Sequence, residues 1–410
     1  MTKTILLLSY FSGIDGCCPA EWLDDKVDSL SELDHNVVLI SGLGSRPEAR
    51  DNVIQFRVPS LSYADLMTEY WQLKSASDVI PYSFYVMLPF SITFGYLLDL
   101  FQKKILNGLG GGKWSWFLPV SFIAIYAAIR YRVGLILTTG GPPSAHLAGI
   151  LAASMVRTKL VIEFQDPLSG DDIGRNSRSA KLLAMVENFL VKFSDRVVYV
   201  TEKAAALARK KFKTDKIISI YPGARRFDLP LKIHEKKSRK LRIVHLGTLY
   251  STRNMSSLID AIDGLISSGR MKENQIEIVN LGDIYGEFKL HHLSRNYIKQ
   301  VPVQPRIDAL TEATEFDMSL LIQHSDERSA ATIPYKTYDY LNISNPIIAL
   351  TNNEELSNLL DQLGHYSANV NNIDQIAELL LKIVNGTIDQ RAFATKGIDP
   401  LVQCQKLITF

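Results

Sequence analysis

Residues 333–350 hold two runs of different character: Ile333-Pro334-Tyr335-Lys336-Thr337-Tyr338-Asp339-Tyr340-Leu341 and, after it, Asn345-Pro346-Ile347-Ile348-Ala349-Leu350. Proline loses nothing at a first helical turn by lacking an N–H, so Pro334 predicts the start of a helix. The short apolar run from Pro346 to Leu350 predicts a buried strand. A helix that leads directly into a buried strand is the repeating unit of a parallel α/β sheet.

The same alternation continues on both sides of this stretch. In the C-terminal half we expect strands at Leu241–Leu246, Gln275–Leu281 and Met318–Ile322, with a helix at Met255–Ser267 and a weaker one at Tyr285–Arg295. In the N-terminal half, strands are expected at Thr4–Ser9, Asn36–Ser41, Val53–Val58, Val133–Thr139, Lys159–Phe164 and Arg196–Thr201. Longer helical segments separate most of them. The pattern predicts an α/β protein with two doubly wound Rossmann-like domains.

The length of the chain also indicates two domains, because 410 residues are too many for one ordinary core. The alternation stops between residues 222 and 240, where Pro222, Gly223 and Pro230 stand among clustered Lys and Arg. We therefore expect a first domain at 1–222, a linker at 223–240 and a second domain at 241–397. Ligands bind at the carboxyl ends of strands in such sheets, so the loops there should face a cleft between the domains.

Composition and charge narrow the class of protein. A hydrophobic content of 46% is typical of a globular chain, and a net charge of +2 argues against a dedicated nucleic-acid binder. Between Lys203 and Arg242, however, 14 Lys or Arg stand against 3 Asp or Glu, and this basic belt suits anionic lipid headgroups, a phosphate-bearing substrate or only water. Cys17, Cys18 and Cys404 have neither disulfide nor metal-site spacing, and no cleavable signal is visible, so we expect a cytoplasmic protein.

Two apolar segments raise the question of a membrane. Val79–Leu98 carries no charge over 20 residues, which is long enough for a helix that spans a membrane. Pro81, Pro89 and Gly95 argue against such a span. Its many Tyr and Phe favour a surface in a membrane interface or a face packed under another element. Trp114–Ile129 is shorter, and we expect a buried helix there.

The helix that begins at Pro334 has the groups that a nucleotide needs. Lys336 lies three residues before Asp339, so both stand near one face of the helix. The lysine can neutralise a diphosphate, and the carboxylate can hold a pair of ribose hydroxyls. We expect Thr332, Pro334 and Tyr335 beside them in a nucleotide-sugar site. The alternative is a Lys-Asp pair on a solvated helix surface.

The loop after Leu246 supplies a second cation. Gly247 and Thr248 open it, and glycine lets a ligand approach the backbone closely. Arg253 follows with a forked donor for phosphate, so that Arg253 and Lys336 offer two catalytic cations for one diphosphate. Such fixed charge can stabilise a departing nucleoside diphosphate without a metal. No Asp-x-Asp pair stands where a divalent ion would be expected, and we expect neither a metal nor a cofactor.

Loops of the first domain offer an acceptor site. Ser12 and Gly13 follow the first strand, where backbone amides can approach a substrate, with an ordinary turn as the alternative. Gln165 and Asp166 follow another strand. Asp166 can position an acceptor hydroxyl or stabilise a developing cationic sugar carbon, although Asp before Pro also commonly opens a turn.

Several short segments, in this order along the chain, resemble those of GT-B glycosyltransferases, most closely the large retaining family 4 group of bacterial polysaccharide assembly. The segments are Thr139-Gly140-Gly141-Pro142-Pro143-Ser144-Ala145-His146, Phe164-Gln165-Asp166-Pro167, Ser194-Asp195-Arg196-Val197-Val198-Tyr199-Val200-Thr201-Glu202, Tyr221-Pro222-Gly223-Ala224, Leu246-Gly247-Thr248, and Pro334 to Leu350. The resemblance spans nearly the whole chain, and the last segment is the most specific.

The resemblance implies a GT-B fold, with two domains facing across a cleft, and a transferase that moves a sugar from a UDP- or GDP-linked donor to a glycan or lipid-linked acceptor. It implies retention, with the donor's own phosphate oxygen taking the acceptor proton, in bacterial surface polysaccharide biosynthesis. Asp339 would bind the donor ribose and Arg253 the diphosphate. The final segment, Ile398–Phe410, would return to the first domain, and the Val79–Leu98 aromatics and the basic belt would dock at the inner membrane surface.

Three positions depart from the family pattern. Ala331 stands where the family often has a glutamate, the ribose acid is Asp339 in place of Glu, and Thr248 replaces a common arginine. A GT-B sugar-nucleotide epimerase and an inactive relative that still binds the nucleotide-sugar therefore remain alternatives. We expect Arg253 and Asp339 at a solvent-facing cleft, where replacing either residue leaves the fold intact.

Overall fold

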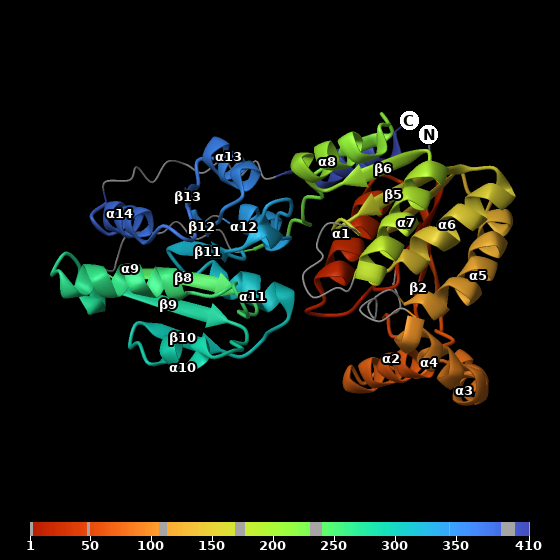
Figure 1. The fold of residues 1–410 in the computed structure, drawn as a ribbon, viewed down its shortest axis with the longest axis horizontal. Coiled ribbons are helices and arrows are strands. Elements are labelled where there is room, and N and C mark those ends of the chain that lie inside the picture. The colour runs from red at the N-terminus through yellow and green to blue at the C-terminus, as the bar shows by residue number, and fades with distance from the viewer. Residues whose placement is uncertain are drawn as a thin grey trace. The chain divides into compact units, whose positions relative to one another are not determined.

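The computed structural model describes residues 3–46, 50–105, 113–168, 177–229, 240–343, 345–386 and 398–409. The chain divides into two compact units (Figure 1): an N-terminal unit of Met1–Pro222 with Pro400–Phe410, and a C-terminal unit of Gly223–Asp399. Of the expected linker, residues 230–239 lie outside the described part of the chain, and the residues before them belong to the C-terminal unit. The N-terminal unit is thus built from two stretches that are far apart in sequence.

A parallel sheet forms the centre of the N-terminal unit. Its described strands are β1 (Thr4–Leu8), β2 (Asn36–Gly42), β3 (Val53–Val58), β4 (Leu135–Thr139), β5 (Lys159–Phe164), β6 (Arg196–Tyr199) and β7 (Ile217–Ser219). They lie in the order β3-β2-β1-β4-β5-β6-β7. The order reverses between β1 and β4, where Ile5 is in register with Leu135. The carboxyl ends of these two strands form the switch point at which ligands bind in sheets of this kind.

Helices cover both faces of this sheet. In chain order, the helical elements of this unit are α1 (Cys18–Glu32), α2 (Tyr63–Ser75), α3 (Tyr82–Phe90), the π-helical turn η1 (Ser91–Gly95), α4 (Tyr96–Ile105), the short 3₁₀ turn η3 (Trp114–Trp116), α5 (Phe117–Arg130), α6 (Pro143–Val156), α7 (Ser177–Phe193), α8 (Glu202–Phe212) and α15 (Pro400–Ile408). Buried Leu23 of α1 and Leu407 of α15 join Ile5 and Leu7 of β1 in one core cluster. The last helix therefore completes the core of the first unit.

A buried carboxyl group lies on α2. The side chain of Glu69 accepts hydrogen bonds from the hydroxyl of Tyr10 at 2.5 Å and from the hydroxyl of Ser60 at 3.0 Å. Burial raises the pKa of the Glu69 carboxyl from an ordinary 4.5 to about 7, and the hydrogen bonds offset only part of that rise. The folded chain therefore holds a proton at Glu69 that the unfolded chain has already released between these two pH values.

This proton predicts a pH-dependent contribution to stability. Because the folded state binds more protons between pH 4.5 and about 7, the contribution of Glu69 to the free energy of unfolding falls as the pH rises through that range. Buried histidines such as His146, whose pKa burial lowers to about 4, act in the opposite direction, so the wild type is best compared with Glu69→Gln. In urea unfolding, the stability of the wild type relative to this variant should fall with rising pH. Parallel stability curves would contradict the prediction.

The C-terminal unit repeats the same architecture. Its described strands are β8 (Leu241–Leu246), β9 (Ile276–Leu281), β10 (Ile298–Val301), β11 (Met318–Ile322), β12 (Ile347–Leu350) and β13 (Tyr366–Ala368). They are parallel, in the order β10-β9-β8-β11-β12-β13. Its helical elements are α9 (Ser256–Ser267), the 3₁₀ turn η4 (Glu273–Gln275), α10 (Phe288–Leu293), α11 (Arg306–Ala313), the 3₁₀ turn η5 (Glu327–Ser329), α12 (Lys336–Leu341), α13 (Glu354–Gln362) and α14 (Ile373–Val384).

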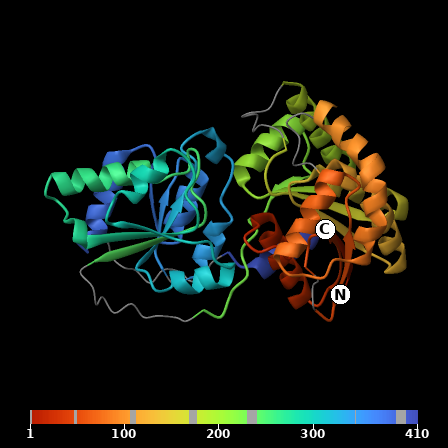
Figure 2. The ribbon, with the colours of Figure 1, turned by 90° about the horizontal axis from the view of Figure 1, so that it is seen from below.

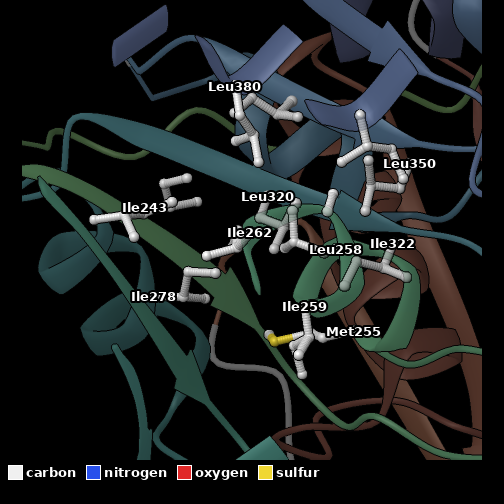
Figure 3. Packing of buried hydrophobic residues seen from close by; sticks show 14 of the residues in the cluster. Ile243, Met255, Leu258, Ile259, Ile262, Ile278, Leu320, Ile322, Leu350 and Leu380 are labelled. Carbon is white, nitrogen blue, oxygen red and sulfur yellow. The ribbon is translucent and has the colours of Figure 1, made fainter. Parts of the chain in front are cut away.

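The core of the C-terminal unit lies between the sheet and the pair α9 and α14. Leu258 and Ile262 of α9 and Leu380 of α14 gather with Ile243 and Leu320 of the central strands (Figure 3). All five side chains are at most 1% exposed. The buried positions of β8 and β11 are mostly apolar, with His245 and Ser319 as exceptions, which is typical of parallel strands covered on both faces.

The expected fold class is confirmed: two doubly wound parallel sheets, each flanked by helices (Figure 2). The expected strand ends differ from the observed ones by no more than two residues. The pattern does not predict β7, β10 and β13, which have three or four residues each and lie at sheet edges. The expectation of a buried helix at Trp114–Ile129 is wrong for one face of α5, because Phe122 and Ile129 are 67% and 65% exposed.

Candidate functional site

The switch point of the C-terminal sheet lies between β8 and β11, which pair through Ile243 with Met318 and Val244 with Ser319. Beyond these pairs a side chain bridges the two strands. The hydroxyl of Tyr340 accepts the N–H of Leu246 at 2.7 Å and donates to the carbonyl of Leu320 at 3.2 Å. Helix α12 is therefore fixed at the carboxyl end of β8, where a ligand is expected in this fold.

Lys336 lies at the same strand end. Its Nζ donates to the carbonyl of Leu246 at 2.7 Å, so Lys336 and Tyr340, four residues apart on α12, hold both backbone groups of Leu246. A Cβ atom on Gly247 would lie 1.7 Å from this Nζ, and Gly247 has a φ of +101°. Only glycine allows the ammonium group to lie against the backbone here. The structure thus brings together two residues that the sequence placed in one site.

Arg253 stands in the loop that follows. Tyr250 and Arg253 exchange backbone hydrogen bonds of 2.9 and 3.0 Å, and the guanidinium carbon lies 5.6 Å from the centre of the Tyr250 ring. Among the described residues, no acceptor bonds the Nε of Arg253, although this atom is buried. A buried donor without an acceptor costs free energy that an anionic oxygen can recover.

The electrostatics of the strand end are positive. Burial lowers the pKa of His245 to about 3, and the charges of Lys336 and Arg253 lower it further. The Nδ2 of Asn280 donates to the carbonyl of Gly282 at 2.7 Å, which leaves its Oδ1 to accept from Nδ1 of His245 at 2.6 Å. His245 is therefore neutral and adds no charge to those of Lys336 and Arg253.

Asp339 has a different environment from the one expected. Its carboxylate accepts hydrogen bonds from Nε and a terminal nitrogen of Arg306 at 3.1 and 2.5 Å, and Asp339 is only 5% exposed. The Arg306 guanidinium also lies 5.4 Å from the centre of the Tyr335 ring, which is itself buried. The expectation of a solvent-facing Asp339 is wrong, because Arg306 of α11 covers it. Its ribose-binding role stays a prediction.

Polar side chains fasten the loop between β11 and α12. The carbonyl of Thr332 accepts from the side-chain amides of Gln323 and Asn353, both at 2.8 Å. Asn353 also caps α13 by accepting the N–H of Leu356 at 3.1 Å. Thr332 is thus held through its backbone, at a fixed distance from the end of β11. Two residues later, the carbonyl of Pro334 accepts the N–H of Thr337 at 2.9 Å, so the turn opens at Pro334 and the α-helix itself begins at Lys336.

A second cluster lies beside Arg253. The hydroxyl of Thr252 donates to Asp326 at 2.7 Å, and Arg328 donates to both Asp326 and Thr252, at 2.6 and 2.7 Å. Hydrogen bonding to Arg328 holds the pKa of Asp326 well below its usual range. Thr248 is partly exposed at the start of the same loop. Within the part of the chain that the structure describes, no three His, Cys, Asp or Glu side chains gather as a metal site.

In the N-terminal unit, Ser12 and Gly13 lie after β1 at the switch point. The hydroxyl of Ser12 and the N–H of Gly13 both donate to the carboxylate of Asp24, at distances from 2.9 to 3.1 Å. Asp24 of α1 is therefore the residue that shapes this loop, and no spacing rule in the sequence indicates it. The expected acceptor role of Ser12 and Gly13 stays a prediction.

Gln165 and Asp166 lie after β5 in the same unit. Asp166 is exposed, and Gln165 is 5% exposed, with an Nε2 that has no hydrogen-bond partner in the described residues. Just before them, Glu163 accepts from Nζ of Lys26 at 2.9 Å and from the hydroxyl of Thr139 at 2.5 Å. The buried ion pair joins α1 to β5, and the Thr139 hydrogen bond joins β4 to β5, just before the loop that carries Asp166.

Two doubly wound parallel units of this kind form the GT-B fold, and solved structures with this fold match nearly the whole chain. HepE from Anabaena, solved with UDP and glucose, has a TM-score of 0.59 at 13% identity and covers 99% of this chain and 98% of its own. The lipopolysaccharide outer core galactosyltransferase WaaB has a TM-score of 0.57 at 9% identity and covers 99% of both chains.

A third structure of the same fold is a putative UDP-N-acetylglucosamine 2-epimerase from Listeria monocytogenes, with a TM-score of 0.55 at 10% identity over 100% of this chain and 95% of that one. Other structures similar to this chain include a glycosyltransferase from Rickettsia africae and a sucrose-phosphate synthase from Thermosynechococcus elongatus. No sequence family matches the chain, and no curated protein is similar to it in sequence. At identities this low the likeness shows a shared fold.

Proposed function

We propose that this chain is a glycosyltransferase that moves a sugar from a nucleotide-sugar to a glycan or lipid-linked acceptor. The observation that carries the proposal is the cationic end of β8, where Lys336 lies against Gly247 and no described residue accepts from the buried Nε of Arg253. A nucleoside diphosphate would supply anionic oxygens at this point. The solved complexes of HepE with UDP and with UDP-glucose, in the same fold, support a UDP-linked donor.

The two cations have a chemical role in this proposal. When the bond between the sugar and the diphosphate breaks, negative charge grows on the departing diphosphate. Fixed cations stabilise this charge more strongly the closer they lie to it. Lys336 is positioned for this by its bond to the Leu246 carbonyl, so it does not have to reorganise during the reaction. We further propose that Asp166 positions the acceptor, that transfer retains the configuration of the sugar, and that the product serves bacterial surface polysaccharide assembly in the cytoplasm.

Calorimetric titration tests donor binding. UDP, GDP and NAD are added separately to the purified chain, first without metal and then with magnesium. We expect UDP or GDP to bind without metal, because protein cations would replace the charge of a divalent ion, and we expect no binding of NAD. Failure of all three to bind would contradict the proposed donor site.

A sugar-nucleotide epimerase is the second candidate, because the Listeria monocytogenes structure shares this fold. The two activities differ in their need for an acceptor. Incubation of the chain with its nucleotide-sugar alone, followed by NMR of the sugar ring, separates them. We expect the donor to keep its configuration without an acceptor, whereas inversion at a ring carbon would identify an epimerase.

A further inference from the structure

One long helix on the N-terminal unit stands out from the rest of the surface. Among the described residues, only the helix Tyr82–Leu100 is long and apolar enough to cross a membrane, and at 1.5 Å per residue it is about 28 Å long. It comprises α3, η1 and the start of α4, next to α2 (Figure 1). Pro89 lacks an N–H inside α3, and the wide turn of η1 follows it directly, so the helix continues past the proline.

A stripe of three residues holds this helix flat against its own unit. Ser91 donates to the carbonyl of Leu61 at 2.8 Å, and a Cβ on Gly95 would lie 2.4 Å from the same carbonyl. Asp99 accepts the N–H of Ala64 at 3.0 Å and the hydroxyl of Ser62, at the start of α2. Ser91, Gly95 and Asp99 are spaced by four residues, so they form one polar seam along the helix.

The side of the helix away from this seam is apolar and exposed. Its members include Tyr82, Tyr85, Phe90, Phe94, Leu97 and Leu100, each of which is at least 43% exposed. We call these six residues the outer face. No charged residue occurs between Val79 and Leu98. Soluble monomers rarely expose a continuous apolar surface of this extent, so the outer face indicates a binding partner.

The charges around the outer face favour an anionic partner. The four acids of residues 63–105 all have partners within the unit: Asp65 with Lys113 at 2.7 Å, Asp78 with Arg46 at 3.6 Å, Glu69 with Tyr10 and Ser60, and Asp99 with the start of α2. By contrast, Lys74 is exposed, 4.9 Å from the ring of exposed Trp71. Positive charge beside an apolar face is the pattern of a helix that lies on anionic lipid.

Part of the basic belt expected to assist such docking is used within the protein. Arg209 pairs with Glu202, Lys211 pairs with Glu187 at 2.6 Å, and Arg242 pairs with Glu277 at 3.2 Å. Residues 230–239 of the belt lie outside the described chain. The case for a lipid surface therefore rests on the outer face and not on the belt.

We propose that the outer face lies in the headgroup region of an anionic membrane, with the helix parallel to the membrane plane. A spanning orientation would have to release Asp99 and Ser91 from the seam and place a carboxylate in lipid, which is costly. Tyr and Trp suit the interface because each has an apolar ring and a polar group. The inference deepens the proposed function, since it would bring the enzyme to a lipid-linked acceptor, but its physical basis is separate from the nucleotide site.

Co-sedimentation with vesicles tests this inference. The purified chain is mixed with vesicles of phosphatidylcholine alone or with added phosphatidylglycerol, and we expect stronger binding to the anionic vesicles. The double variant Phe94→Ser with Leu97→Ser removes two members of the outer face and should bind at least about tenfold more weakly. The matched control is Leu290→Ser with Val303→Ser, which removes two exposed apolar side chains of the C-terminal unit and should bind like the wild type.

Each further outcome has a defined meaning. Equal vesicle binding by the outer-face variant and the wild type would overturn the inference. The inference would also be overturned if the wild type did not bind vesicles but self-associated, and the outer-face variant abolished that self-association. Retention of the wild type on vesicles after an alkaline wash would contradict the flat orientation, because spanning helices resist such extraction. UDP titration of the same variants keeps the two proposals distinct: the outer-face variant should bind nucleotide like the wild type, whatever its behaviour with lipid.

Discussion

Replacing Arg253 with alanine should weaken UDP binding by about 10-fold to 100-fold, because a charge-assisted hydrogen bond in a partly buried site contributes about 1.5 to 3 kcal/mol. The substitution removes a buried Nε that no described residue bonds, so the unliganded protein loses little by the change. Calorimetric titration of the wild type and Arg253→Ala with UDP, without metal, measures the difference.

Arg270→Ala is the matched control for this prediction. Arg270 is an exposed arginine of the same unit, beyond the end of α9, and its removal changes the net charge equally. We expect the control to bind UDP like the wild type. If both variants lost affinity alike, the effect would be one of overall charge. Unchanged binding in Arg253→Ala would remove this arginine from the site.

Replacing Asp339 with alanine should destabilise the C-terminal unit by about 3 kcal/mol or more, since breaking a buried ion pair leaves an uncompensated charge. The side chains of Asp339 and Arg306 are only 7% and 14% exposed, so water cannot readily solvate the remaining guanidinium. Urea unfolding of the variant measures the loss. The structure thus reverses the expectation from sequence that Asp339 can be removed without harm to the fold.

The control and a second variant separate a structural role from a binding role. Asp308→Ala, an exposed acid on the same helix as Arg306, should leave stability unchanged. In Arg306→Ala with Asp339→Ala together, the loss should be smaller than the sum of the two single losses, because no charge is left alone. An Asp339→Ala chain that unfolds like the wild type but no longer binds UDP would show instead that this carboxylate serves the ligand.

The sequence predicts the fold well where strands are buried on both faces. The central strands β1, β4, β8 and β11 are mostly apolar and rich in Leu and Ile, and such runs have few other interpretations. The sequence does not predict β7, β10 and β13, because they are short and lie at the edges of their sheets. An edge strand pairs with only one neighbouring strand, and its side chains need not be apolar. The exposed face of α5 is not predicted either, because its residues are apolar although they do not face the core.

In the candidate site, too, features that depend on neighbouring residues could be predicted from the sequence, whereas contacts between distant residues could not. Gly247 and Lys336 could be paired from sequence because each stands at the end of a recognisable strand or the start of a recognisable helix. Arg306 could not be predicted as the partner of Asp339, because 33 residues separate them and α11 follows a strand that gives little signal. Tyr340 likewise has no pattern that reveals its bridge between two strands.

The return of α15 to the first unit has a consequence for how the chain folds as it is synthesised. Residues 223–399 form one continuous unit and can fold as soon as they leave the ribosome. The N-terminal unit is completed only later, because the face of α1 that carries Leu23 is closed by Leu407 and Ile408, which are made after the whole C-terminal unit. An apolar strip on α1 therefore stays uncovered while the C-terminal unit is being synthesised, and during that interval it is open to contact with a chaperone.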